Sequence, residues 1–207
     1  NMPSISKNTD QNGNGEQITN ALPWMKVAEA YFLRAEGALR GWNMGGTAKD
    51  LYEQGIKVSF DEYGISAVDY AAYIADDKSV AANHVDPFNP QNNIEGLDKC
   101  TVKWDEGASK EEKLHKIINQ KWLAMYPEGQ EAWSEFRRTG YPKLFPVANN
   151  FSATVDGGIA NGEFVKRLRF PRNDRNTNAA EVEKARGLLN GPDNEGTRLW
   201  WDTGKNF

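Results

Sequence analysis

The residues best placed for acid–base chemistry are neighbouring carboxylates, because glycoside hydrolysis uses two carboxyl groups that flank the bond to be cleaved. Glu131 and Glu135 are four residues apart and share one face of an expected helix. Asp105–Glu106 and Asp61–Glu62 are adjacent pairs. Carboxylates on neighbouring helix turns are usually solvated or paired with cations, and Arg138 is placed to pair with Glu135. These carboxylates therefore predict ion pairs rather than a catalytic dyad.

Metal and nucleophile chemistry have few candidates. His84 and His115 are the two histidines, and Cys100 is the one cysteine. A single cysteine excludes an internal disulfide and a four-cysteine zinc site. His115 is interpreted as a surface residue because Lys113 and Lys116 flank it on an expected helix. The sequence has no GxSxG, HExxH or phosphate-binding-loop motif, so we expect no enzymatic activity, no metal and no cofactor.

The charge balance excludes further functions. The 207 residues include 25 Lys and Arg against 29 Asp and Glu, a net charge of −4, whereas nucleic-acid-binding proteins usually carry a basic excess. No apolar run reaches the roughly 18 residues of a membrane span. The first residues lack a signal pattern, so any targeting segment is expected upstream. One local basic segment is interpreted as salt-bridged, and it contains Lys166, Arg167, Arg169, Arg172 and Arg175.

The elements that position these residues are mainly helical. Residues 1–21 predict an extended polar lead-in, and residues 22–64 predict a helical hairpin of tetratricopeptide type. Arg34 lies off the polar stripe of the first helix, so it needs an inward carboxylate or carbonyl partner. The expected buried face of that helix contains Val27, Tyr31, Ala35 and Ala38, and its polar stripe contains Glu29, Glu36 and Arg40.

The second helix of the hairpin has start and stop signals. Thr47 and Asp50 form a weak capping box, and Gly64 suits the position after a helix, where φ is often positive. A short helix is expected over residues 67–75. Residues 76–107 predict a long loop because prolines and asparagines cluster in HVDPFNPQNN, and loops this long are usually functional. The buried face of the second helix is expected to contain Tyr52, Ile56, Ser59, Phe60 and Tyr63.

Residues 109–140 predict two helices that carry much of the aromatic mass. Ser109 and Glu112 form a capping box at the first helix. A short Pro-Glu-Gly connection folds the two apolar faces together, so their aromatic residues are interpreted as core. Arg137 and Arg138 point about 100° apart, so one can face inward and hold loop carbonyls or carboxylates. The apolar faces contain Leu114, Ile117, Ile118, Trp122, Met125, Trp133 and Phe136.

Residues 141–207 predict loops, a strand over 164–170 where apolar and basic residues alternate, a last helix over about 179–189 and a tail ending in LWWDTGKNF. Several stretches, taken in order, resemble a known family. INQKWLAMYPEGQEAWSEFRRTGYPKL is similar to the signature of the SusD/RagB nutrient-binding outer-membrane lipoproteins of Bacteroidota. The resemblance continues in PWMKVAEAYFLRAEGALRG, RLRFPRNDRNTNAAEVEKA and GPDNEGTRLWWD.

The resemblance implies a mainly α SusD-like fold with tetratricopeptide-type hairpins, long loops and minor β structure, of which residues 1–207 would be the C-terminal portion. It implies a surface-exposed outer-membrane location through an N-terminal lipid anchor that this chain lacks. It further implies non-catalytic binding of a nutrient glycan, an oligo- or polysaccharide, and its delivery to a SusC-like TonB-dependent transporter. A peptide or protein nutrient is the first alternative, and a glycoside hydrolase is the second.

Candidate ligand contacts follow from loop position and side-chain chemistry, because sugars bind to exposed aromatic rings and to polar side chains that hydrogen-bond their hydroxyl groups. The family signature itself is interpreted as structural, and the resemblance transfers no binding residue. The candidates are His84, Phe88, Asn89, Asn92 and Asn93 in the first loop, Trp104 at its end, and Asn150 and Phe151 in a second loop.

Overall fold

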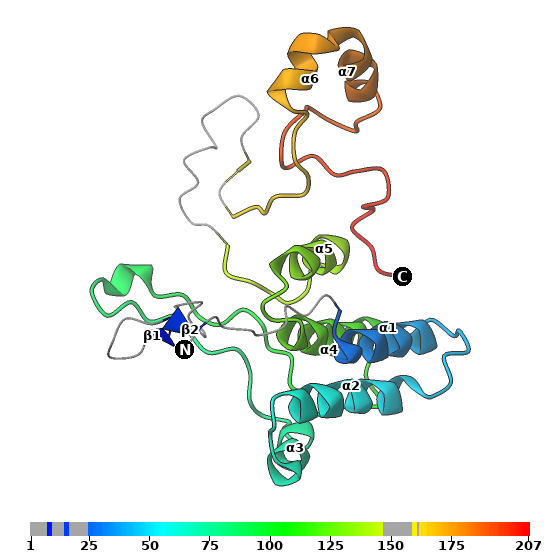
Figure 1. Ribbon diagram of the computed structural model, residues 1–207, viewed down its shortest axis with the longest axis vertical. Coiled ribbons are helices and arrows are strands. Elements are labelled where there is room, and N and C mark those ends of the chain that lie inside the picture. The colour runs from blue at the N-terminus through cyan, green and yellow to red at the C-terminus, as the bar shows by residue number, and fades with distance from the viewer. Residues whose placement is uncertain (1–7, 10–14, 17–24, 147–158, 161) are drawn as a thin grey trace.

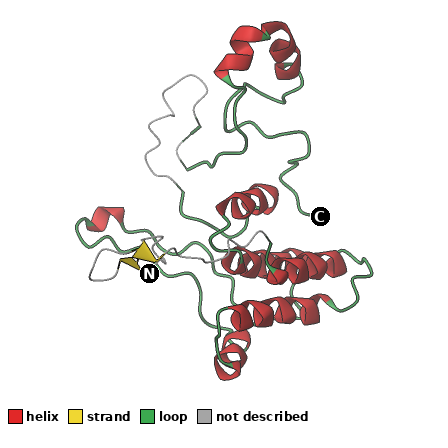
Figure 2. Ribbon diagram, viewed as in Figure 1, coloured by secondary structure: helices red, strands yellow, loops and turns green. Residues whose placement is uncertain are grey.

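The computed structural model describes residues 8–9, 15–16, 25–146, 159–160 and 162–207. Within these ranges the fold is mainly α, as predicted (Figure 2). The helices are α1 (Val27–Leu39), α2 (Ala48–Glu62), α3 (Ala67–Ile74), the 3-10 helix η1 (Pro90–Asn92), α4 (Lys110–Ala124), α5 (Gly129–Thr139), α6 (Arg172–Thr177) and α7 (Ala179–Arg186). Strands β1 (Asn8–Thr9) and β2 (Gly15–Glu16) form one short antiparallel pair.

Helices α1, α2 and α4 form the packed centre of the chain, and α3 lies at the end of α2 (Figure 1). Phe32 of α1 lies against Gly55 of α2, where a Cβ atom would be 2.8 Å from the Phe32 ring. The absent side chain therefore lets the two helices approach closely. The main apolar cluster contains Ala28, Phe32, Ala35, Leu51, Tyr52, Ile56, Val102, Trp104, Ile117 and Ala124.

Local signals fixed the helix starts as expected. Thr47 accepts a hydrogen bond from the Asp50 backbone N–H, and Ser109 and Glu112 form a reciprocal capping box. Gly64 follows α2 with a φ of +67°. The buried face of α1, however, is rotated by one residue from the prediction, because Ala28 is buried and Val27 is 62% exposed. Tyr63, also predicted to be buried, is exposed.

A buried ionic network joins α1, α4 and α5. Lys121 is 1% exposed and its ammonium lies 2.8 Å from Glu135 and 3.0 Å from Glu131. Arg138 pairs with Glu135 and with Glu36, which also accepts hydrogen bonds from Arg40. Glu36, predicted on the polar stripe of α1, is buried, and the guanidinium groups of Arg138 and Arg40 meet its carboxylate. The expected Glu135–Arg138 pair is confirmed.

Two other arginines have the partners that the sequence required. Arg34 donates two hydrogen bonds to the Met44 carbonyl, at 3.0 and 2.8 Å. Arg137 donates to the Lys166 carbonyl at 2.8 Å, and its guanidinium lies 4.0 Å from the centre of a Trp133 ring. Both members of the Arg137–Arg138 doublet therefore connect helix α5 to other segments.

The C-terminal part extends beyond α5, with α6 and α7 at the opposite end of the molecule from α3 (Figure 1). The predicted strand over 164–170 is wrong, since these residues form a loop. The backbone N–H groups of Lys166 and Arg167 both donate to the Glu195 carbonyl. The arginine side chains form ion pairs, Arg167 with Asp193 and Arg169 with Glu195, which confirms a salt-bridged segment.

Candidate ligand-binding site

The two ends of the loop between α3 and α4 are joined to each other by backbone hydrogen bonds. Ala81 N–H donates to the Asp98 carbonyl, and His84 exchanges two backbone hydrogen bonds with Ile94, at 2.8 and 3.0 Å. At Gly96 a Cβ atom would lie 2.1 Å from the Ala81 carbonyl oxygen. Any other residue at this position would therefore prevent the backbone at Gly96 from lying so close to the backbone at Ala81. In Figure 1 the loop projects away from the helices.

The tip of this loop is organised around one carboxylate. Asp86 Oδ1 accepts hydrogen bonds from the backbone N–H groups of Phe88 and Asn89, at 2.8 and 3.0 Å. Its Oδ2 accepts from the Asn92 amide at 2.7 Å. Asn93 Oδ1 in turn accepts from the Asp86 N–H at 2.8 Å. These donors hold the pKa of Asp86 below its ordinary value, so the tip is held by an ionised carboxylate at neutral pH.

Phe88 stands on this tip with 95% of its surface exposed. An exposed aromatic ring on a braced turn has a free face for stacking. The structure thus brings together Phe88, Asn89, Asn92 and Asn93 at the tip, whereas the fifth predicted contact in this loop, His84, lies at its base with its ring 6.2 Å from that of Phe145. The asparagines already brace the turn, since Asn89 Oδ1 also accepts from the Gln91 N–H. The Phe88 side chain, in contrast, makes none of the hydrogen bonds that hold the turn, although its backbone N–H donates to Asp86.

Trp104 lies apart from the loop tip, at the end of the loop. It is 8% exposed, and its ring lies 5.1 Å from the ring of Tyr52, whose hydroxyl donates to the Val102 carbonyl. The residue therefore anchors the end of the loop in the core, and it also lines the cavity where the loop returns to α4, so its role as a sugar contact stays a prediction. Asn150 and Phe151 lie outside the described residues.

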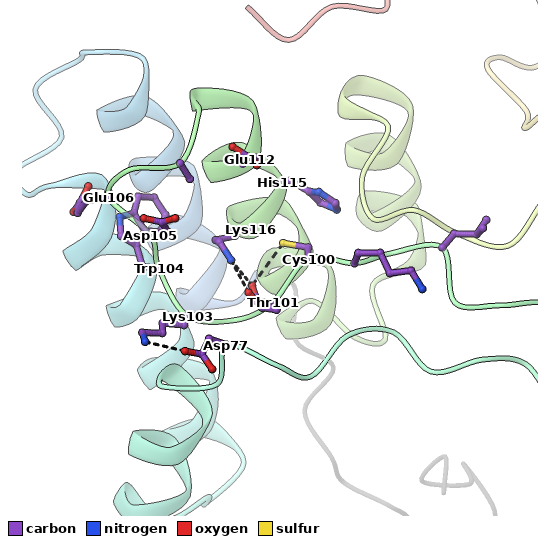
Figure 3. Close-up of a pocket in the computed structure, with 13 residues that line it drawn as sticks. Asp77, Cys100, Thr101, Lys103, Trp104, Asp105, Glu106, Glu112, His115 and Lys116 are labelled. Carbon is purple, nitrogen blue, oxygen red and sulfur yellow. Dashed lines mark hydrogen bonds and ion pairs between the residues drawn. The ribbon is translucent and has the colours of Figure 1, made fainter.

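A second concave region lies where the loop returns to α4. This open cavity of about 710 Å³ is lined by charged and polar side chains, among them Asp77, Lys103, Asp105, Glu112 and Lys116 (Figure 3). His115 also lines it and is half-buried, which corrects its prediction as a free surface residue. The His115 ring stacks on Tyr141 at 3.9 Å and lies 2.9 Å from Asp98.

The carboxylates that could suggest hydrolysis are committed to other contacts. Glu131 and Glu135 both hold the buried Lys121 ammonium. Asp105 accepts from the Gly107 N–H, which closes a turn. Within the described ranges, every carboxyl group whose pKa departs from its ordinary value has a lowered pKa: Glu36, Asp76, Asp86, Glu95, Asp98, Glu112, Asp193 and Glu195. A general acid needs a raised one.

Comparison with known proteins identifies the fold family. The SusD-like family model, described as SusD and RagB outer membrane lipoprotein, matches residues 4–202. The chain belongs to the SusD-like family. A chitin-binding SusD homolog from Flavobacterium johnsoniae is 55% identical, with a TM-score of 0.80 over 87% of this chain and 36% of that one. Comparison with the curated proteins finds no match.

Other SusD-like structures agree. A SusD-like protein from Bacteroides thetaiotaomicron is 43% identical, with a TM-score of 0.78 over 91% of this chain and 38% of that chain. A homolog from Bacteroides vulgatus is 40% identical, with a TM-score of 0.79 and coverages of 94% and 39%. The present chain thus spans well under half the length of these relatives. Of its described helices, none combines the length and apolar character of a membrane span.

Sequence reasoning on this SusD-like chain missed two features. Asp86 was not singled out, although Asp before Pro is a signal for a side-chain-capped turn. Trp200 is 90% exposed and was not distinguished from the rest of the LWWD motif. No local signal could have found the contact of Asp98 with His115, because 17 residues separate them and only the return of the loop brings them together.

Proposed function

We propose that this chain is part of a non-catalytic protein that binds a nutrient glycan. The observation that carries the proposal is the exposed ring of Phe88 on a tip braced by Asp86. A pyranose presents an apolar face of C–H groups that stacks on such a ring, and nearby polar side chains then bind its hydroxyl groups. The tip asparagines and, at the base of the loop, His84 are the polar groups proposed for this role.

The glycan proposed is chitin or its oligosaccharides. The support is the Flavobacterium johnsoniae homolog, which is 55% identical and is described as chitin-binding. N-acetylglucosamine adds an acetamido group with one N–H donor and one carbonyl acceptor. Asn89 Oδ1 and Asn92 Nδ2 are already bound within the turn, which leaves the Asn89 side-chain amide N–H as a donor and the Asn92 side-chain carbonyl oxygen as an acceptor for that group.

The site chemistry supports binding without cleavage. The carboxylates nearest to a hydrolytic arrangement, Glu131 and Glu135, share the Lys121 ammonium and are therefore unavailable as an acid and a nucleophile. The family description as an outer membrane lipoprotein supports a location at that membrane. We further propose a surface-exposed position through a lipid anchor and delivery of the glycan to a SusC-like TonB-dependent transporter.

The test is titration of the full-length protein with chito-oligosaccharides, with new reducing ends assayed in parallel. Replacing Phe88 with Ala should weaken binding about fivefold, because a stacked ring contributes on the order of 1 kcal/mol. Leu188→Ala is the control, since Leu188 is 86% exposed and lies on the α7 side of the chain. Unchanged affinity of Phe88→Ala would remove the tip from the binding site, and new reducing ends would show a hydrolase.

A peptide nutrient is the second candidate. An apolar cavity of about 510 Å³ is lined by Tyr63, Trp122, Leu123 and Tyr126, and Glu128 is also part of the lining. An apolar cavity with one carboxylate in its lining suits a peptide side chain better than a sugar. Titration with a mixture of short peptides distinguishes the two, because peptide binding that Tyr126→Ala abolishes and Phe88→Ala leaves intact would favour the peptide.

A further inference from the structure

Three potential metal ligands lie close together, and two of them, Cys100 and His115, line the 710 Å³ cavity. Asp98 and Cys100 come from the returning loop, and His115 comes from α4. One ligand atom from each residue lies within 4.8 Å of the other two. Figure 3 shows Cys100 and His115 on these neighbouring segments, both labelled among the residues that line the cavity.

Two of the three side chains are already held in place. Asp98 is 5% exposed, and its Oδ1 accepts a hydrogen bond from the Cys100 N–H. Its Oδ2 accepts from the Lys143 N–H and contacts His115 Nε2 at 2.9 Å. The stacking of the His115 ring on Tyr141 fixes the plane of the imidazole. Pre-positioned ligands lose little conformational freedom when an ion binds.

The ligand atoms lie within 4.8 Å of one another, so side-chain movement is needed to reach the spacing of a tetrahedral ion. Zinc binds histidine nitrogen and carboxylate oxygen at about 2.0–2.1 Å and cysteine sulfur at about 2.3 Å, so tetrahedral ligand atoms lie roughly 3.3–3.6 Å apart. The Asp98–His115 distance of 2.9 Å would have to open slightly. The Cys100 thiol currently faces the Thr101 carbonyl at 3.6 Å, and rotation about its single χ1 torsion would bring the sulfur inward.

We propose that Asp98, Cys100 and His115 bind a divalent cation of the zinc class, with the fourth position open to the cavity. The ligand set of one sulfur, one nitrogen and one oxygen favours Zn²⁺ or Co²⁺ over the oxygen-seeking Ca²⁺ and Mg²⁺. Binding forms a metal–sulfur bond, and the thiol proton passes to the buffer. The thiolate and the carboxylate then neutralise the ion.

The surroundings are compatible with this charge. The Lys116 ammonium donates to the Thr101 carbonyl at 2.7 Å, so it is already satisfied beside a site that becomes neutral overall. Glu112 lines the same cavity one helical turn before His115, but it caps α4 through Ser109, which is consistent with an open fourth position. Burial raises the pKa of the Cys100 thiol to about 11, so metal binding has to displace its proton.

The test is cobalt spectroscopy of the full-length protein. Co²⁺ bound by a thiolate gives a near-ultraviolet charge-transfer band, and tetrahedral Co²⁺ gives strong visible bands. Both are expected in the wild type. Cys100→Ser should abolish the charge-transfer band, and Asp98→Asn or His115→Ala should weaken Co²⁺ binding at least tenfold. His84→Ala is the matched control, because it removes the other histidine from an exposed position and should leave both signals unchanged.

Circular dichroism of each variant separates loss of a ligand from loss of the fold, and Zn²⁺ should displace Co²⁺ and bleach the visible bands. A wild type without the charge-transfer band would overturn the proposal. A band that persists in Cys100→Ser would also overturn it, because the thiolate would then come from another residue. Loss of binding in His84→Ala alone would likewise assign the metal to a different site. None of these outcomes depends on whether a glycan binds to the loop tip.

Discussion

Arg138 and Glu36 form a two-point ion pair across 102 residues of sequence, with Nη1 to Oε1 at 2.7 Å and Nη2 to Oε2 at 2.6 Å. The pair joins α5 to α1, and the Glu36 side chain is 9% exposed. A planar guanidinium that meets both carboxylate oxygens gives the contact a defined direction as well as charge. The RRTG part of the family signature therefore has a structural role.

Removing this cation should destabilise the fold. Arg138→Met leaves Glu36 and Glu135 with fewer partners, and we expect the free energy of unfolding to fall by about 3 kcal/mol. Denaturant unfolding of the purified protein measures this quantity. Arg186→Met is the control, because its exposed pair with Glu183 should contribute less than about 1 kcal/mol. Equal, small losses in the two variants would contradict a stabilising role for the pair.

The same carboxylate predicts how stability depends on pH. Burial alone would raise the pKa of Glu36, but the guanidinium groups of Arg138 and Arg40 outweigh it and hold the pKa below the ordinary 4.5. The folded state therefore releases this proton more readily than the unfolded state. The resulting stabilisation is complete above the ordinary pKa and is lost as pH falls through the lowered one.

Denaturant unfolding at pH values from neutral down to acid checks this expectation. The free energy of unfolding should decline below about pH 5 in the wild type. Glu36→Gln should be less stable at pH 7 and should show a shallower decline. Glu183→Gln, at an exposed pair, should keep the wild-type slope. A wild-type slope in Glu36→Gln would mean that other groups set the acid sensitivity.

An added methyl group should have opposite effects at two glycines, Gly55 in the contact between α1 and α2 and Gly129 at the start of α5. Gly55→Ala would place a methyl group 2.8 Å from the Phe32 ring, and overpacking of this kind usually costs about 1–3 kcal/mol. Gly129 begins α5 with nothing within 4 Å of an added Cβ, so Gly129→Ala should be neutral or stabilise by up to about 1 kcal/mol. Thermal melting of both variants measures the difference, and a stable Gly55→Ala would show that the helices can separate freely.

Asp86 should control the order of the loop tip without affecting the global fold. Asp86→Ala removes the acceptor of three hydrogen bonds, so the amides of Phe88 and Asn89 should exchange with solvent faster. Hydrogen-exchange mass spectrometry of the loop peptides measures this rate. Asp77→Ala serves for comparison, because Asp77 pairs with exposed Lys103 elsewhere in the loop. Unchanged exchange in Asp86→Ala would show that the backbone alone holds the tip.

The helices of this chain could be predicted because their signals are local. Ser109 and Glu112 are three residues apart, and each caps a backbone group within its own turn. The phase of α1 was less certain, because apolar residues cover most of its circumference. Ala28, and not Val27, faces inward since the positions of α2 and α4 decide which apolar side becomes core.

The errors lie where distant segments meet. The alternation over 164–170 resembled a strand, but it arises because Phe164 packs on Phe136 while Arg167 and Arg169 pair with residues near 195. Of the candidate site, the position of Phe88 was predictable because the loop composition excludes regular structure. The burial of Trp104 was not, since its environment is made by Tyr52 from α2.

The bracing of the loop tip has a consequence for how specificity could diversify. Its hydrogen bonds run between residues 81 and 98. The segment contacts the rest of the chain through Asp98, which meets His115 and the Lys143 N–H, and through the His84 ring, which lies 6.2 Å from that of Phe145. Such a segment could be exchanged as a unit between homologous proteins, with the Ala81–Asp98 hydrogen bond as its boundary. The residues of the ligand-facing surface could then change during evolution while the ion pairs of Arg138 with Glu36 and of Lys121 with Glu131 and Glu135 stay the same.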